Sequence, residues 1–130
     1  MADLRIDREK TAVIVMDVQK EIVQMTPMAQ GRGVVPKIKG VIGAAREAGL
    51  PVMYVVVEFR EGYPEISSTN RMFHGIKEAG RMQEGSFGIE IPSEIAPLHT
   101  EPIIVKRRLN AFYNTDLATV LRAKGITNLV

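Results

Sequence analysis

The chain of 130 residues has no cysteine and no tryptophan, and its aromatic side chains are three tyrosines and four phenylalanines. Without cysteine, the sequence excludes disulfide bonds and cysteine-ligated metal sites. A net charge of +2 is a small basic excess, and no basic run is interleaved with aromatic residues. Nucleic acid is therefore not expected as a partner.

Long apolar runs are also absent. The longest, residues 12–16 and 50–57, are far too short to cross a bilayer. The first ten residues, MADLRIDREK, are charged and lack the apolar centre of a secretory signal. We therefore expect a cytoplasmic protein with no membrane partner.

The residues that are present predict a sheet of buried strands. A composition of 45% hydrophobic and 25% charged residues is typical of one globular domain, which we place at residues 1–130. Short, largely β-branched runs predict strands that are buried on both faces, as in parallel sheets. These runs are residues 11–16, 51–57, 102–105 and the opening of a fourth strand at 126–130.

Two helices are predicted between these strands. The first begins near Pro36, which suits an initial helical turn, and ends at Gly49. The second covers residues 116–124, with Thr115 as its N-cap and Gly125 as its stop. Strands that alternate with helices indicate an α/β fold of three layers, α/β/α, around a mostly parallel sheet.

Residues 59–100 show no regular period and are rich in glycine and proline. The segment is too long for an ordinary connection, and long irregular segments in compact domains often form lids or substrate loops. A surface excursion without a role is the equally weighted alternative.

Two ionisable residues follow or end apolar strands. Asp17 comes after the first strand and Lys106 after the third. Ligands of doubly wound sheets bind outside the carboxyl ends of the strands, where strand order reverses. A carboxylate there is a candidate general base, and a nearby ammonium can stabilise negative charge. Taken alone, the two residues are more consistent with solvated strand boundaries than with a site.

Four motifs, in order, resemble those of the isochorismatase-like cysteine hydrolases. The first strand and its Asp-x-Gln ending read AVIVMDVQ, and a Gly-Ser stretch reads EGSFGIEI. The block after the third strand reads IVKRRLNAF, and the following helix and strand read NTDL and LRAKGITNLV. The resemblance extends from about Lys10 to Val130.

This resemblance implies six strands in the order 3-2-1-4-5-6, of which the chain supplies the first four. It implies Asp17 as the base and Lys106 as its cationic partner in an Asp-Lys-Cys set. It further implies hydrolysis of a small amide, carbamoyl or enol-ether compound, without a cofactor, by a homodimer or homotetramer.

The cysteine itself is missing, because the family's nucleophile follows the fourth strand and the sequence ends at Val130. Three explanations compete. The domain is C-terminally incomplete, which we expect; or the chain is a non-catalytic remnant or assembly subunit; or Asp17 acts with a water or a metal in place of a thiol. A phosphate-handling doubly wound fold is a further rival, but it requires a second carboxylate or a glycine-rich loop after the first strand.

Several residues near the expected crevice are candidates for substrate binding. An arginine pair is suited to bidentate recognition of a carboxylate, although adjacent arginines are commonly solvated. For the other candidates, the alternative to a binding role is packing in the core or a polar position at the start of a helix. These candidates are Gln19, Phe59, Arg107, Phe112 and Tyr113.

No metal is expected. The nicotinamidase branch of the family carries Asp-x-His-x-x-His after its second strand, and residues 58–64, EFREGYP, hold no histidine. The two histidines, His74 and His99, lie apart in the irregular segment and are expected to be surface side chains.

Overall fold

The computed structural model describes residues 5–130. Four parallel strands form one sheet in the order β3-β2-β1-β4. The strands are β1 (Thr11–Met16), β2 (Val52–Val57), β3 (Ile103–Lys106) and β4 (Asn128–Leu129). The α/β class, the parallel sheet and the order of these four strands are as the sequence predicted.

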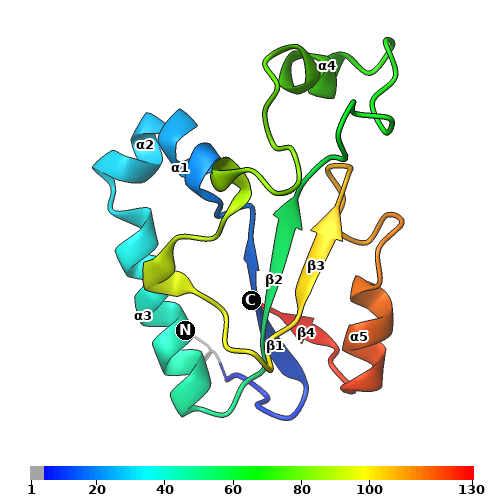
Figure 1. Cartoon of the computed structure of the whole chain (residues 1–130). Coiled ribbons are helices and arrows are strands. Elements are labelled where there is room, and N and C mark those ends of the chain that lie inside the picture. Colours follow the sequence, from blue (N-terminus) through cyan, green and yellow to red (C-terminus); the bar gives the residue numbers. More distant parts are fainter. Residues whose placement is uncertain (1–4) are drawn as a thin grey trace.

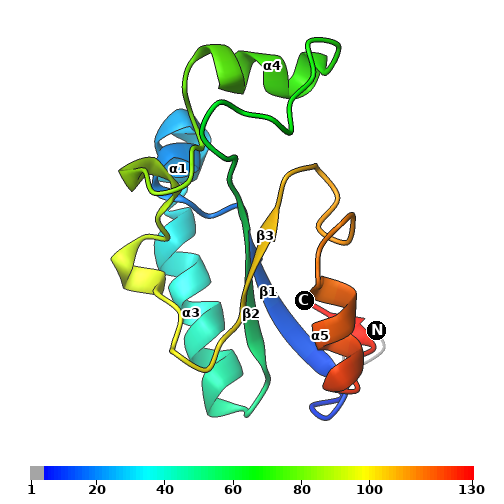
Figure 2. The same ribbon diagram turned by 45° about the vertical axis from the view of Figure 1, so that its right-hand side comes forward.

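Helices cover both faces of the sheet. The long helix α3 (Val34–Glu47) lies on one face and α5 (Leu117–Ala123) on the other, which gives three layers (Figures 1 and 2). Two short helices, α1 (Lys20–Met25) and α2 (Pro27–Gly31), connect β1 to α3. The described residues include no helix long and apolar enough to cross a membrane.

Each face of the sheet has its own apolar core. On the α3 face, Val13, Val15 and Tyr54 pack with Ile42 and Ala45 of the helix. On the α5 face, the buried residues are Ala12, Met53, Val55, Ile104, Ala111, Leu117 and Leu121. Alternate residues of the strands enter opposite cores, so β2 is buried along its whole length and the sequence reads as a continuous apolar run.

A third cluster lies beyond the carboxyl end of β2. Phe59 packs against Tyr63 and Phe73, with ring centroids 6.0 and 5.4 Å away. Phe73 belongs to α4 (Arg71–Glu78), which stands above the strand ends in Figure 1. The expectation that residues 59–100 lack regular structure is therefore wrong for this helix and for two 3-10 turns, η1 (Phe87–Ile89) and η2 (Ser93–Ile95).

The predicted helix boundaries need small corrections. Helix α3 begins two residues before Pro36, and Asp116, not Thr115, is the N-cap of α5. Thr115 still contributes at that end, since its Oγ1 accepts from the backbone N–H of Leu117 at 3.3 Å. Gly49 and Gly125 end the two helices with φ of 74° and 67°, the left-handed stops that were predicted.

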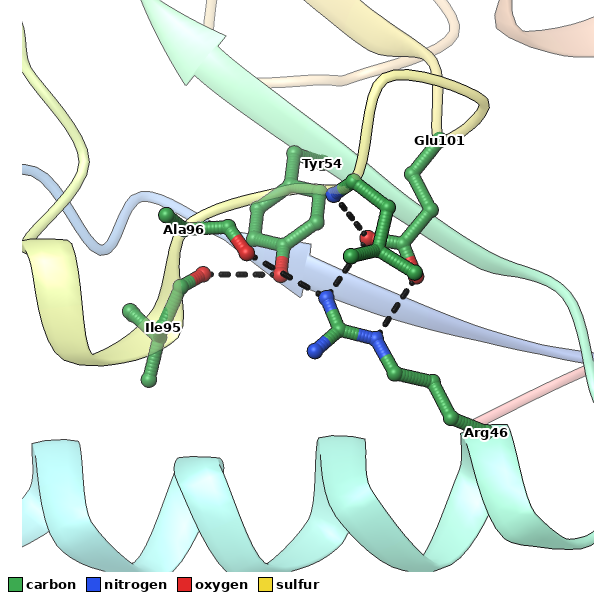
Figure 3. Close-up of polar contacts among 6 residues, drawn as sticks. Arg46, Tyr54, Ile95, Ala96 and Glu101 are labelled. Atoms are coloured by element: carbon green, nitrogen blue, oxygen red, sulfur yellow. Dashed lines mark hydrogen bonds and ion pairs between the residues drawn. The ribbon is translucent and has the colours of Figure 1, made fainter.

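A buried polar cluster ties the η2 loop to the rest of the domain (Figure 3). Arg46 of α3 donates from Nε and Nη2 to the two carboxylate oxygens of Glu101, at 2.8 and 2.7 Å. Glu101 also accepts from the backbone N–H of Leu98 at 2.8 Å. The hydroxyl of Tyr54 donates to the carbonyl of Ile95 at 2.8 Å, so helix, strand and loop are cross-linked at this point.

Candidate active site

An ion pair between Asp17 and Lys106 lies at the carboxyl edge of the sheet. Lys106 ends β3, and Asp17 directly follows β1. The Nζ of Lys106 donates to Oδ2 of Asp17 at 2.9 Å and to the carbonyl of Leu109 at 3.0 Å. Since β2 lies between the two strands, the lysine side chain extends past the end of β2 to reach the carboxylate.

The two partners differ in burial. The side chain of Lys106 is 4% exposed, whereas that of Asp17 is 41% exposed. The Oδ1 atom of Asp17 has no hydrogen-bond partner within residues 5–130. Because this oxygen is also inaccessible to solvent, it is an unsatisfied buried acceptor, the kind of group that commonly marks a functional position.

The backbone of Asp17 adopts the left-handed conformation, with φ of 60°. Non-glycine residues rarely occupy this region, although aspartate and asparagine tolerate it best. A hydrogen bond from the N–H of Asp17 to the carbonyl of Val55, 3.0 Å long, holds the turn against β2. Strained conformations of this kind cluster at functional sites, where surrounding contacts enforce them.

The structure places the side chain of Gln19 in the interior, bonded to backbone groups. Its side chain is fully buried, and its Nε2 donates to the carbonyls of Val57 and Ile89, both at 2.9 Å. Its Oε1 accepts from the N–H of Val57 at 2.9 Å. With its amide bonded to backbone groups, Gln19 holds the end of β1 against the end of β2 and against η1, and is not free to bind a substrate.

The three aromatic candidates lie in three different environments. Phe59 is fully buried in the third apolar cluster, where it packs beneath the loops that follow β2. Phe112 is half exposed in a shallow hollow formed with α5. Tyr113 is exposed and lines a pocket that it shares with Arg107.

This pocket, with a volume of about 330 Å³, lies between the loops that follow β2 and β3. Its lining residues are Arg60, Glu65, Arg107, Arg108, Tyr113 and Asn114. Arg60 follows the second strand and was expected from the sequence to lie near the crevice wall, whereas Glu65 and Asn114 were not expected at a site. These lining residues could have been expected near one another, because loops that follow neighbouring parallel strands meet at the same edge of the sheet.

A second carboxyl group lies at this edge. Glu58 directly follows β2 and is partly buried. Burial raises the pKa of Glu58, while the nearby Arg107 charge lowers it and Glu84 raises it further. The arginine therefore partly offsets the cost of placing this carboxylate at the strand end.

Within residues 5–130, no three His, Cys, Asp or Glu side chains come together as a metal site. His74 lies on α4, and its Nδ1 is 3.6 Å from a carboxylate oxygen of Glu78 one turn later. An ion pair at the edge of a parallel sheet, with an unsatisfied acceptor and a left-handed backbone, is thus the main chemical feature of the described chain.

The family model named Isochorismatase domain matches residues 11–130. The chain belongs to the isochorismatase family. This match agrees with the resemblance read from the four sequence motifs, and it covers the ion pair and the loops around it.

Two curated relatives show the range of this family. A "Probable inactive nicotinamidase" of Arabidopsis thaliana is 28% identical over 92% of this chain and 63% of its own length. A "Ureidoacrylate amidohydrolase RutB" of Rhizobium rhizogenes is 29% identical over 93% of this chain and 57% of its own length. Both relatives are longer than this isochorismatase-family chain, which spans less than two thirds of either.

Solved structures agree with the fold. A cysteine hydrolase from Pseudomonas syringae superposes with a TM-score of 0.83 at 27% identity, covering 95% of this chain and 59% of that one. An N-carbamoylsarcosine amidase from Thermoplasma acidophilum has a TM-score of 0.73 at 32% identity, over 92% of this chain and 65% of its own. The family therefore includes hydrolases that carry amidase names.

Proposed function

We propose that the chain carries two members, Asp17 and Lys106, of an Asp-Lys-Cys site that hydrolyses a small amide or carbamoyl compound. The observation that carries the proposal is the 2.9 Å ion pair between a buried ammonium and a half-exposed carboxylate at the strand ends. The 130 residues hold no cysteine. The nucleophilic thiol is therefore proposed to come from a part of the protein outside them.

In the proposed reaction, Asp17 takes the proton of the thiol, and the thiolate sulfur forms a bond to the carbonyl carbon of the substrate. The carbon–nitrogen bond then breaks, and the leaving nitrogen receives the proton from Asp17. A water molecule next loses a proton to Asp17, and its oxygen forms a bond to the thioester carbon. The carbon–sulfur bond breaks, the acid is released, and the sulfur takes the proton from Asp17 to restore the thiol. Lys106 remains charged throughout and stabilises the anionic partners.

Support comes from geometry and from relatives. The buried position of Lys106 keeps its charge directed at Asp17 and the Leu109 carbonyl, so the pair is held before any ligand binds. The names of two similar proteins, an ureidoacrylate amidohydrolase and an N-carbamoylsarcosine amidase, favour a carbamoyl substrate.

The test uses the longest natural polypeptide that contains these 130 residues, assayed for ammonia release from N-carbamoyl compounds. Asp17→Asn removes the base and keeps a side chain that tolerates the left-handed backbone. We expect kcat to fall by about 10²–10⁴-fold. Lys106→Met, which keeps the length of the stem, should lower kcat to a similar extent.

Matched controls are Asp116→Asn and Lys124→Met, because both residues are exposed and lie at the two ends of α5. These variants should retain wild-type turnover. Near-normal activity in Asp17→Asn or Lys106→Met, with the controls unchanged, would refute the assigned roles.

The alternative is a non-catalytic subunit that keeps the fold. Two observations favour it, namely the absence of cysteine from the sequence and the name of a relative given as a probable inactive nicotinamidase. If the natural polypeptide supplies no cysteine and releases no ammonia, this alternative replaces the hydrolase proposal.

A further inference from the structure

The hydrogen-bond ladder between β1 and β2 ends in an unusual way. In a parallel ladder, a residue donates to the carbonyl one position before its partner and accepts from the N–H one position after it. Asp17 makes the first of these bonds, since its N–H donates to the carbonyl of Val55 at 3.0 Å. In a longer β1, the N–H of Val57 would next donate to the carbonyl of Asp17, and the carbonyl of Val57 would accept from the N–H of Gln19.

Both backbone groups of Val57 bind the side chain of Gln19 instead. The N–H of Val57 donates to Oε1 at 2.9 Å, and its carbonyl accepts from Nε2 at 2.9 Å. The amide therefore supplies the acceptor and the donor that the backbone of β1 would supply in a longer strand. Both residues are buried, and unpaired backbone groups in the interior are costly, so the ladder depends on this amide.

The replacement of backbone by side chain leaves Asp17 free to turn. Side chains of a strand alternate between its two faces. Val13 and Val15 enter the core on the α3 face, so an extended Asp17 would point to that face as well. Ile104 enters the core on the α5 face, and Lys106, two residues later in β3, shares its side of the strand. The left-handed turn is therefore what directs the carboxylate to the lysine.

Further bonds hold the segment after the turn. The Nε2 of Gln19 also donates to the carbonyl of Ile89 in η1 at 2.9 Å, and the N–H of Lys20 donates to the carbonyl of Glu90 at 2.8 Å. Helix α1 and η1 lie side by side at the carboxyl end of β1 (Figures 1 and 2). Two carbonyls that need a donor and one N–H that needs an acceptor allow a single orientation of the amide.

We propose that Gln19 is a positioning residue for the catalytic base. Its amide takes the place of the β1 backbone beside Val57 and so holds the left-handed turn that directs Asp17 to Lys106. The inference rests on the proposed hydrolase function and adds to it a residue that acts through Asp17 without touching the substrate.

The experiment uses NMR of the longest natural polypeptide and the variant Gln19→Met, which keeps the length of the side chain and removes the amide. The readout is the cross-peak between the N–H and Hα of Asp17, which is strong when φ is positive because the two hydrogens are then close. We expect this peak to fall in Gln19→Met to the intensity of the extended residues of β1. A peak that stays strong in this variant would overturn the proposal.

Tyr54→Phe is the matched control. It also removes one buried hydrogen bond from a side chain to a loop carbonyl, that of Ile95, on the other side of the fold from the ion pair. The Asp17 peak should stay strong in this variant. Its loss in the control would contradict the assignment, because any loss of a buried hydrogen bond would then release the turn.

Gln19→Glu keeps the shape of the side chain and tests the same role if the methionine variant does not fold. Its carboxyl has a donor only while protonated, and burial raises the pKa of such a group. The Asp17 peak should be strong at about pH 5 and weak at about pH 9 in this variant, but strong at both in the wild type. The neighbouring charges of Asp17, Lys20, Lys106 and Glu90 are common to both proteins. A peak that stays strong in the variant at the higher pH contradicts the proposal.

Kinetics show whether Gln19 acts through Asp17. In the natural polypeptide, Gln19→Met should lower kcat by about 10–10²-fold and leave KM nearly unchanged, because a misplaced base slows the reaction more than it weakens binding. In an Asp17→Asn background, the same change should lower kcat by less than about threefold. Equal losses in the two backgrounds would show that Gln19 does not act through Asp17.

Failure of this proposal is distinguishable from failure of the hydrolase proposal. If the natural polypeptide releases ammonia and depends on Asp17, but Gln19→Met keeps the strong Asp17 peak and full turnover, the positioning role alone is wrong. If no ammonia is released and the peak still requires the amide, Gln19 holds the turn and the hydrolase proposal falls.

Discussion

Two partly buried ion pairs in this chain are built in opposite ways. Arg46 and Glu101 meet on the α3 face, where Glu101 accepts three hydrogen bonds at 2.7–2.8 Å (Figure 3). Asp17 and Lys106 meet at the carboxyl edge of the sheet through a single hydrogen bond, and one carboxylate oxygen has no partner in the described chain. Both carboxylate oxygens of Glu101 therefore accept hydrogen bonds, whereas only one carboxylate oxygen of Asp17 does so within the described residues.

Burial divides the pairs in the same way. The carboxylate of Glu101 is 9% exposed, whereas that of Asp17 is 41% exposed. A carboxylate with all its hydrogen bonds made contributes to stability, whereas a partly exposed carboxylate with an unsatisfied oxygen is a candidate for chemistry. We therefore expect substitutions in the Arg46–Glu101 pair to lower stability more than activity. Substitutions in the Asp17–Lys106 pair should lower activity more than stability.

The largest effect on stability is expected from Glu101→Gln. The change removes the charge that binds Arg46, and it turns one acceptor into a donor beside other donors. We expect the free energy of unfolding in urea to fall by about 2 kcal/mol. Glu94→Gln on the exposed side of η2 is the control, and a loss as small as that of the control would show that the pair is not structural.

The pH dependence of stability gives the next effect. Hydrogen bonds from Arg46 hold the pKa of Glu101 below its ordinary value of 4.5, while burial opposes them and the Leu98 N–H assists. A lowered pKa means that the stabilisation is present above the unfolded-state value and is lost as the pH falls through the folded-state value.

The stability advantage of the wild type over Glu101→Gln should therefore be constant near neutral pH and shrink below about pH 4.5. Urea unfolding of both proteins between pH 7 and pH 3 measures it. An advantage that persists unchanged at pH 3 would contradict the assigned ion pair.

The smallest effect on stability is expected from Lys106→Met. The substitution removes a charge that is 4% exposed and leaves Asp17, whose side chain is 41% exposed. Removing one partner of an ion pair is costly mainly when the remaining charge stays buried, and the Asp17 side chain is only partly buried. We expect the free energy of unfolding to change by less than about 1 kcal/mol, with Lys124→Met as control. A large loss of stability would mean that the second pair is structural as well.

The first three strands could be predicted closely from the sequence, because each is largely a continuous apolar run, whereas β4 is shorter than the predicted 126–130 and is exposed. The run at 11–16 coincides with β1, and the predicted β2 differs by one residue. Strand β3 extends through Lys106, one residue further than predicted, because a lysine whose stem is buried can continue a ladder.

Helix α4 was missed because it is short, contains Gly75 and lies in a segment without long-range periodicity. Its N-cap was a readable signal, since the side chain of Asn70 accepts from the N–H of Phe73 at 3.2 Å. Helices α1 and α2 bury no side chain, and so they leave no apolar stripe in the sequence.

The candidate site was predictable only in part. Asp17 and Lys106 stand out because each interrupts an apolar context at a strand end, and the structure brings them together. The roles of Gln19 and Glu65 depend on backbone atoms and side chains that are distant in sequence, such as Ile89 and Arg107. No local pattern encodes such contacts, because they exist only after the loops have met.

The left-handed backbone at position 17 limits what protein engineering can do there. Glycine, asparagine and aspartate occupy that conformation at low cost, and other residues pay a steric penalty. A saturation library at this position would therefore fall into two groups, variants that fail because the turn cannot form and variants that fail because the carboxylate is gone. Asparagine and glycine form the second group, so comparing them with the rest measures how much of the position's intolerance is conformational and how much is chemical.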